Sequence, residues 1–98
     1  MNEPSFEWDE GKNVVNVRKH GVSFSAAQHA FKDPCRVIAK DLAHGRKEPR
    51  YYRFGRDRDG VSILTVRFTW RLGCIRIIGA GYWRKGKAIY EQANSLSR

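Results

Sequence analysis

Acidic residues are missing between Asp59 and Glu91, and this gap is the strongest departure from an ordinary composition. Up to Asp33, five acidic residues accompany four basic ones, whereas after Asp33 fifteen basic residues accompany five acidic ones. The net charge of +9 therefore comes from the last two thirds of the chain. Because a charge segregated in this way creates a directed field that attracts polyanions, RNA or DNA is the first partner to consider.

Long apolar runs and cysteine-rich patterns are also lacking. No apolar run approaches the roughly 20 residues that span a bilayer, and the N-terminus has neither the basic start nor the apolar core of a signal peptide. Cys35 and Cys74 suggest no disulfide framework, and no histidine or cysteine spacing fits a metal site. We therefore expect a cytoplasmic protein with no metal, no other cofactor and no membrane contact.

The length and the apolar content favour one compact domain over residues 1–98. A chain of 98 residues can bury one hydrophobic core but has no room for a second. Hydrophobic residues make up 41% of the chain and aromatic residues 12%, which argues against disorder.

Two short helices are expected in the N-terminal third. Asp9 can cap a helix over about residues 11–20, and Gly21 can end it in a left-handed turn. Ser23 can cap a second helix, which Pro34 would stop. Apolar residues at helical spacing are expected to face the core: Val14, Val17, Phe24, Ala27 and Phe31.

From Cys35 onward the apolar period changes to two, which is typical of strands. Strands are expected over about residues 35–40, 50–54, 61–70 and 74–80. Short connections favour an antiparallel meander with the helices packed on one face. The fold class is therefore α+β: two N-terminal helices, a four-stranded antiparallel sheet and a C-terminal helix.

The C-terminal helix is expected over about residues 83–95. Ile89, Ala93 and Leu96 recur at helical spacing and would form its inward stripe. Gly86 inside this helix would cost about 1 kcal/mol relative to alanine.

Arginines of the last two strands predict a phosphate-binding surface. If these strands pair as a hairpin, Arg67 and Arg76 fall on the same face, opposite to the core. The planar fork of a guanidinium group suits phosphate, and aromatic rings can stack on unpaired bases. Further residues are expected to border the surface and to bind RNA: Arg50, Tyr82, Trp83, Arg84 and Lys85.

The same surface could cleave RNA. Attack by a ribose 2′-hydroxyl on its phosphate needs a base, cations that stabilise the phosphorane, and an acid for the leaving oxygen. The two arginines can stabilise the charge, and His44 and Glu48, on the loop before the second expected strand, are the candidates for proton transfer. His20 and Lys85 are further candidates, although His20 also fits a structural role at a helix C-terminus. A non-catalytic nucleic-acid-binding module and an interaction protein with an acidic partner stay open as alternatives.

A series of short motifs, in the same order, resembles the BrnT toxins. These motifs are Phe6-Glu7-Trp8-Asp9, Lys19-His20-Gly21-Val22-Ser23-Phe24, Phe31-Lys32-Asp33-Pro34, Glu48-Pro49-Arg50-Tyr51, Gly55, Phe68-Thr69, Ile75-Arg76-Ile77-Ile78-Gly79-Ala80 and Arg84-Lys85-Gly86-Lys87-Ala88-Ile89-Tyr90-Glu91. The resemblance implies a RelE-like fold and an endoribonuclease toxin that stops translation. It also implies a bacterial type II toxin–antitoxin system, in which a BrnA-like ribbon-helix-helix antitoxin neutralises the toxin and carries the complex to operator DNA.

The chain departs from this resemblance after the last expected strand. The commoner family pattern there is Ser-Ala-Arg, whereas this chain has Gly79-Ala80-Gly81. A serine hydroxyl and an arginine are therefore missing. Two expectations stay open: Tyr82 or Trp83 substitutes by stacking on a base, or the activity is weaker or differently specific.

Overall fold

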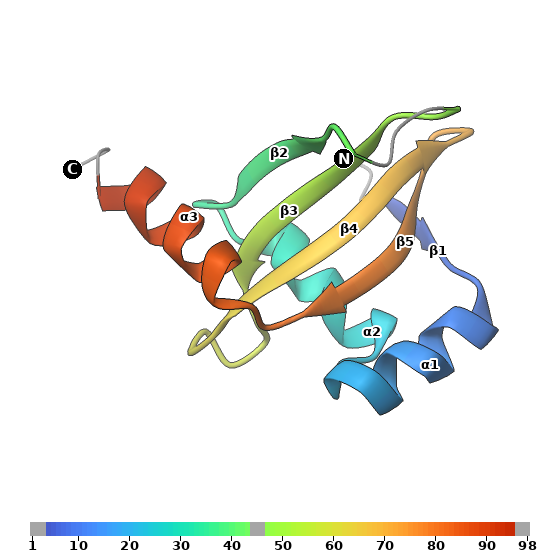
Figure 1. The fold of residues 1–98 in the computed structure, drawn as a ribbon, viewed down its shortest axis with the longest axis horizontal. Helices are drawn as coiled ribbons and strands as arrows, with labels where there is room; N and C mark the ends of the chain where they lie inside the picture. Colours follow the sequence, from blue (N-terminus) through green and yellow to red (C-terminus); the bar gives the residue numbers. More distant parts are fainter. Residues whose placement is uncertain (1–3, 44–46, 96–98) are drawn as a thin grey trace.

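The computed structural model describes residues 4–43 and 47–95, which form a five-stranded sheet with helices against both faces (Figure 1). The elements in chain order are β1 (Ser5–Glu7), α1 (Glu10–His20), α2 (Phe24–Ala27), the 3₁₀ helix η1 (Gln28–Lys32), β2 (Val37–Asp41), β3 (Arg50–Arg56), β4 (Ile63–Arg71), β5 (Cys74–Gly81) and α3 (Arg84–Ser95). The strand order is β1-β5-β4-β3-β2. None of the helices in the described part is long and apolar enough to cross a membrane.

The α+β class is confirmed, but the expected four-stranded antiparallel sheet is wrong in one strand. β1 adds a fifth strand parallel to β5, with Phe6 opposite Ile75, so the sheet is mixed. Three residues are too few for an alternating pattern to stand out. Their partners also lie about 69 positions further along the chain, so local sequence carries no sign of the pairing.

The helix boundaries expected from capping residues are confirmed. Asp9 Oδ2 accepts a hydrogen bond from the Lys12 amide at 2.9 Å, and Gly21 ends α1 with a φ of 70°. Ser23 Oγ accepts from the Ala26 amide at 3.0 Å and so caps α2. The second expected helix is regular only over Phe24–Ala27 and continues to Lys32 as a 3₁₀ turn.

The main core lies between the sheet and the α2–η1 segment. Its buried residues are Val22, Phe24, Ala27, Ala30, Leu64, Val66, Phe68, Ile75, Ile77 and Ala80. Gly55 of β3 lies directly under η1, because a Cβ at this position would overlap the carbonyl oxygen of Ala30. The 3₁₀ backbone therefore rests on the strand with no side chain between them.

The expectation that all helices pack on one face is wrong, because α3 covers part of the opposite face. A second cluster of Phe54, Ile63 and Tyr90 holds it there. In Figure 1, α3 starts in front of β3 and β4, while η1 lies behind these two strands and α2 lies by β5. The buried residues of α3 are Gly86 and Tyr90, and Ile89 packs against the same cluster, as expected. Ala93, also expected to face inward, is exposed. Leu96 lies outside the described residues.

The expected apolar stripe of α1 is also wrong. Val14 and Val17 are 41% and 43% exposed, and Asn16 is the residue of this helix that is buried. A polar contact rather than an apolar one therefore attaches α1 to the sheet.

Asp33 joins η1, β3 and α3 through one buried carboxylate. Its Oδ2 accepts from the Tyr90 hydroxyl at 2.7 Å and from the Arg56 amide at 2.9 Å, and its Oδ1 accepts from the Cys35 amide at 2.8 Å. Burial raises the pKa of Asp33, but these hydrogen bonds outweigh it, and the pKa lies below its ordinary value of 3.8. Burial and the hydrogen bond to Asp33 raise the pKa of Tyr90 to about 12.

We expect the Asp33 carboxylate to make stability fall in acid. The pKa of Asp33 is lower in the folded chain, so the unfolded chain binds the proton first as the pH falls. The contribution of the ionised carboxylate to the free energy of unfolding is therefore fully present above the ordinary pKa and is lost as the pH falls through the pKa of the folded chain. Tyr90→Phe should lower the free energy of unfolding by about 1.5–3 kcal/mol at pH 7, and the deficit should shrink toward pH 2. Urea titrations over this range measure it. The control Tyr82→Phe, which removes an exposed hydrogen bond to Asp57, should cost little; equal losses in both variants would contradict this role of Asp33.

We expect Gly86→Ala to destabilise the protein, contrary to helix propensity, which favours alanine by about 1 kcal/mol. A Cβ at Gly86 would overlap Thr65 Oγ1 and lie 3.1 Å from Phe54 Cδ1. The overlap should outweigh the gain in helix propensity, so that the substitution lowers the free energy of unfolding in urea by about 1–3 kcal/mol. The matched control is Ala88→Gly on the exposed side of α3, which should lose about 1 kcal/mol through propensity alone. A stabilised Gly86→Ala variant would show that α3 does not approach β4 so closely.

Candidate nucleic-acid interface

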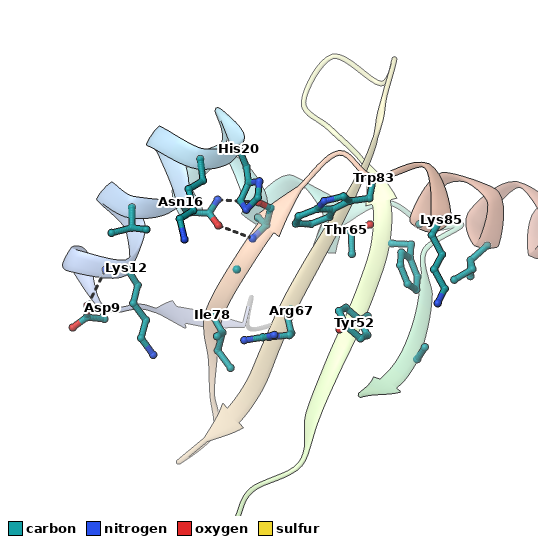
Figure 2. A pocket seen from close by; sticks show the side chains of 18 of the residues that line it. Asp9, Lys12, Asn16, His20, Tyr52, Thr65, Arg67, Ile78, Trp83 and Lys85 are labelled. Carbon is teal, nitrogen blue, oxygen red and sulfur yellow. Dashed lines mark hydrogen bonds between the residues drawn. The ribbon is translucent and has the colours of Figure 1, made fainter. Parts of the chain in front are cut away.

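A groove of about 980 Å³ lies between α1 and α3, over the part of the sheet that α3 leaves open. Figure 2 shows α1 on one side, the first turn of α3 on the other, and the strands between them. Side chains of the strands line its floor: Tyr52, Phe54, Thr65, Arg67 and Ile78. Polar and aromatic residues from α1 and from the start of α3 line its walls: Lys12, Asn16, Lys19, His20, Trp83 and Lys85.

Asn16 attaches α1 to the edge of β5. Its Nδ2 donates to the carbonyl oxygens of Val22 and Ala80, both at 2.8 Å, and its Oδ1 accepts from the Ala80 amide at 3.2 Å. β1 pairs with β5 only from Cys74 to Arg76, so Ala80 lies beyond the reach of that strand. The Asn16 amide thus supplies the hydrogen bonds that a neighbouring strand would make and fixes α1 as a wall of the groove.

The lining of the groove is strongly positive. Lys12, Lys19, Arg67 and Lys85 line it, whereas Asp9 is the one acidic residue among the described residues that do so. The Asp9 carboxylate is already the cap of α1, where it accepts from a backbone amide. The cations therefore face the groove without a carboxylate dedicated to neutralising them.

Arg67 lies at the centre of the floor. It is opposite Tyr52 on one side and Gly79 on the other, and Figure 2 shows its guanidinium extending toward Ile78. Its Nε is buried, and no described residue accepts a hydrogen bond from it. Arg67 is thus a partly buried cation with unsatisfied hydrogen-bonding capacity.

His20 and Trp83 meet at one end of the groove. Their ring centroids are 5.0 Å apart and their planes are inclined by 67°, an edge-to-face contact. The contact joins the last residue of α1 to the residue before α3. An imidazole and an exposed indole therefore stand beside the basic floor.

Arg67 and Arg76 lie on the same face of the sheet, as expected from the sequence. Arg76 is opposite Thr69, and Thr69 lies two residues from Arg67 on β4 and so on the same face. However, Arg76 Nη1 lies 3.1 Å from Glu7 Oε2 of β1, and Arg76 does not line the groove. Arg50 also stands outside the groove, and its buried Nε has no hydrogen-bond partner in the described part of the chain.

The remaining expected site residues divide between the groove and other surfaces. Trp83 and Lys85 line the groove, and exposed Arg84 does not. Glu48 Oε1 is 2.9 Å from Arg71 Nη2, and the Tyr82 hydroxyl donates to Asp57 Oδ2 at 3.2 Å, so neither side chain joins the groove. Burial and Asp57 raise the pKa of Tyr82. His44 lies outside the described residues.

Lys12 and Lys19 line the groove but were missed by the sequence analysis, which also considered a structural role for His20. A signal existed, since Lys12, Asn16 and Lys19 recur at i, i+4 and i+7 and so share one face of α1. The apolar spacing of Val14 and Val17 in the same helix instead predicted a different buried face.

The fold and the groove together define a small α+β protein with a positively charged, aromatic-bordered groove on its sheet. The family model described as "Ribonuclease toxin, BrnT, of type II toxin-antitoxin system" matches residues 8–86, and the chain belongs to this family. It is therefore a toxin of a type II toxin–antitoxin system, a class that acts together with an antitoxin. A search of the curated proteins finds no match.

We expect Asn16→Ala to destabilise the protein and to loosen α1. The substitution leaves two buried carbonyl oxygens and one amide without partners, which should cost about 2–4 kcal/mol in urea unfolding. Hydrogen exchange of the α1 amides should accelerate more than exchange in β4. Val17→Ala on the exposed side of α1 is the control and should change stability by less than about 0.5 kcal/mol. Similar losses in both variants would mean that apolar packing holds α1 instead.

Proposed function

We propose that this toxin is an endoribonuclease that binds RNA in the groove between α1 and α3, with Arg67 against a phosphate. The observation that carries this proposal is the buried, unsatisfied Nε of Arg67 on the floor of a groove walled by Lys12, Lys19 and Lys85. A guanidinium group that is partly desolvated and unpaired is destabilised. A phosphate oxygen would offset that cost with charge-assisted hydrogen bonds.

The proposed reaction is attack of a ribose 2′-hydroxyl on the adjacent phosphorus, with release of the 5′-oxygen of the next nucleotide. Negative charge accumulates on the phosphorane oxygens, and Arg67, together with Lys12 or Lys85, would stabilise it. A cation fixed on a strand before the substrate arrives acts without reorganisation, which is why its location on β4 matters.

His20 is the proposed group for proton transfer. It is the imidazole among the described residues lining the groove, and an imidazole can both accept and donate a proton. Glu48, which the sequence also suggested, is paired with Arg71 outside the groove. His44 stays a sequence-based candidate. Arg76 and Arg50 share the face of Arg67 and would contact the strand further along its backbone.

Cleavage of RNA in the cytoplasm would stop translation, and a BrnA-like ribbon-helix-helix antitoxin would neutralise the toxin. The family match supports an antitoxin partner, and the basic surface of the chain suits a partner with acidic segments. Contact with operator DNA would then occur through the antitoxin.

We expect Arg67→Ala to lower the rate of RNA cleavage by about a hundredfold or more, because it removes a preorganised charge from the transition state. Arg67→Lys should recover only part of the rate, since it keeps the charge but loses the planar fork. Gel electrophoresis of end-labelled RNA measures the rate. The control is Arg58→Ala in the exposed β3–β4 turn, which should cleave normally.

Three outcomes separate the candidate functions. Loss of cleavage in the Arg67 variants with intact folding supports the nuclease. If the unaltered protein and its variants all bind RNA with a steep salt dependence but leave it intact, a non-catalytic binding module is supported. Absence of both binding and cleavage at physiological salt would favour a protein whose positive surface serves only its antitoxin.

A further inference from the structure

The indole of Trp83 lies flat over the backbone of Gly81. A Cβ built on Gly81 would be 2.6, 2.8 and 2.9 Å from the indole carbons Cη2, Cζ3 and Cζ2. A point in the ring plane, beyond its edge, would be much closer to Cη2 than to its two neighbours. The nearly equal distances therefore place Gly81 under the face of the six-membered ring, in a position that only a residue without a side chain can occupy.

The rest of the indole remains accessible. Trp83 is 43% exposed although Gly81 supports one face of its ring. His20 meets it at 67°, so the imidazole does not stack on the indole and instead restricts its rotation from the side of α1. A large flat ring is thus held in one orientation while much of its surface faces solvent and the groove (Figure 2).

The charges beside the indole are those that suit a nucleic-acid backbone. Lys85 and Arg67 line the same groove as Trp83. A nucleotide carries its anionic phosphate and its flat base on one sugar. A groove with a cation on its floor, further cations on its walls and a fixed aromatic ring beside them can therefore engage both parts at once.

We infer that Trp83 is a stacking platform for an unpaired base, that Gly81 is the positioning residue which lets the indole lie flat, and that the groove takes single-stranded rather than duplex nucleic acid. This inference rests on the proposed function for the location of the strand. In a duplex both faces of each base are already stacked on neighbouring pairs, so the indole gains nothing there.

Equilibrium binding to a labelled single-stranded oligodeoxynucleotide tests the platform without cleavage, because a strand lacking 2′-hydroxyl groups cannot react by the proposed chemistry. Fluorescence anisotropy should show that Trp83→Leu weakens binding about fivefold to a hundredfold. Trp83→Phe, which keeps a smaller ring, should lose less. The matched control is Trp70→Leu, since Trp70 is 51% exposed on β4 but lies outside the groove, and it should bind normally. A duplex of equal length should bind the Trp83→Leu and unaltered proteins alike.

A double-mutant cycle tests the role of Gly81. Gly81→Ala should weaken single-strand binding in the protein with Trp83, and should have no further effect in the Trp83→Leu background, because its only action is through the indole. A spectroscopic readout is independent of affinity: in a protein with Trp8→Phe and Trp70→Phe, single-stranded DNA should quench the fluorescence of Trp83. Thermal unfolding of each variant identifies any general loss of structure.

Failure of the platform and failure of the nuclease are distinguishable. If Trp83→Leu binds the single strand normally while Arg67→Ala does not, the platform is overturned and the groove assignment survives. If neither substitution changes binding, both the stacking platform and the groove assignment are overturned. If binding depends on Trp83 but RNA stays intact, the platform stands and the nuclease proposal fails. An additional loss from Gly81→Ala in the Trp83→Leu background would show that Gly81 acts on the fold and not on the indole.

Discussion

The amide of Asn16 is the contact on which the shape of this protein depends. A helix with exposed valines has little apolar reason to lie against the sheet, and α1 is attached instead by three hydrogen bonds to Val22 and Ala80. The bonds are possible because β1 ends at Glu7, so that the C-terminal part of β5 has no strand neighbour on that edge. α1 therefore takes the place of a strand at that edge and turns the side of Lys12 and Lys19 toward the open sheet face.

The opposite wall is fixed by different means. α3 approaches β4 through Gly86, where the absence of a side chain allows contact with Thr65, and Tyr90 anchors the helix to the Asp33 carboxylate. One wall thus depends on a backbone-like hydrogen-bond pattern and the other on close packing and a buried carboxylate.

The distribution of acids explains why the groove stays positive. The carboxylates near the sheet ends have partners away from the groove: Glu7 with Arg76, Glu48 with Arg71, and Asp57 with Tyr82. Arg67 has no such partner in the described part of the chain, although it lies on the same face as Arg76. The geometry therefore divides two arginines that are equivalent in sequence, one in an ion pair at the edge and one unsatisfied on the floor. A strand register shows that two side chains share a face, but it does not show which of them a distant carboxylate will reach.

The sequence by itself determined the features that depend on neighbouring residues. Asp9, Gly21 and Ser23 set the helix ends because capping is a contact within four residues, and the alternation from Val37 to Ala80 set four of the strands. The segregation of charge was likewise visible without coordinates, and so was the likeness to the family that the chain belongs to. Only the tertiary structure decided that β1 joins β5, that α3 crosses to the other face, and that Asn16, rather than the valines, holds α1. These outcomes depend on pairings between residues far apart in the chain, such as Asn16 with Ala80 and Asp33 with Tyr90. No local pattern encodes which distant partner a polar side chain will find.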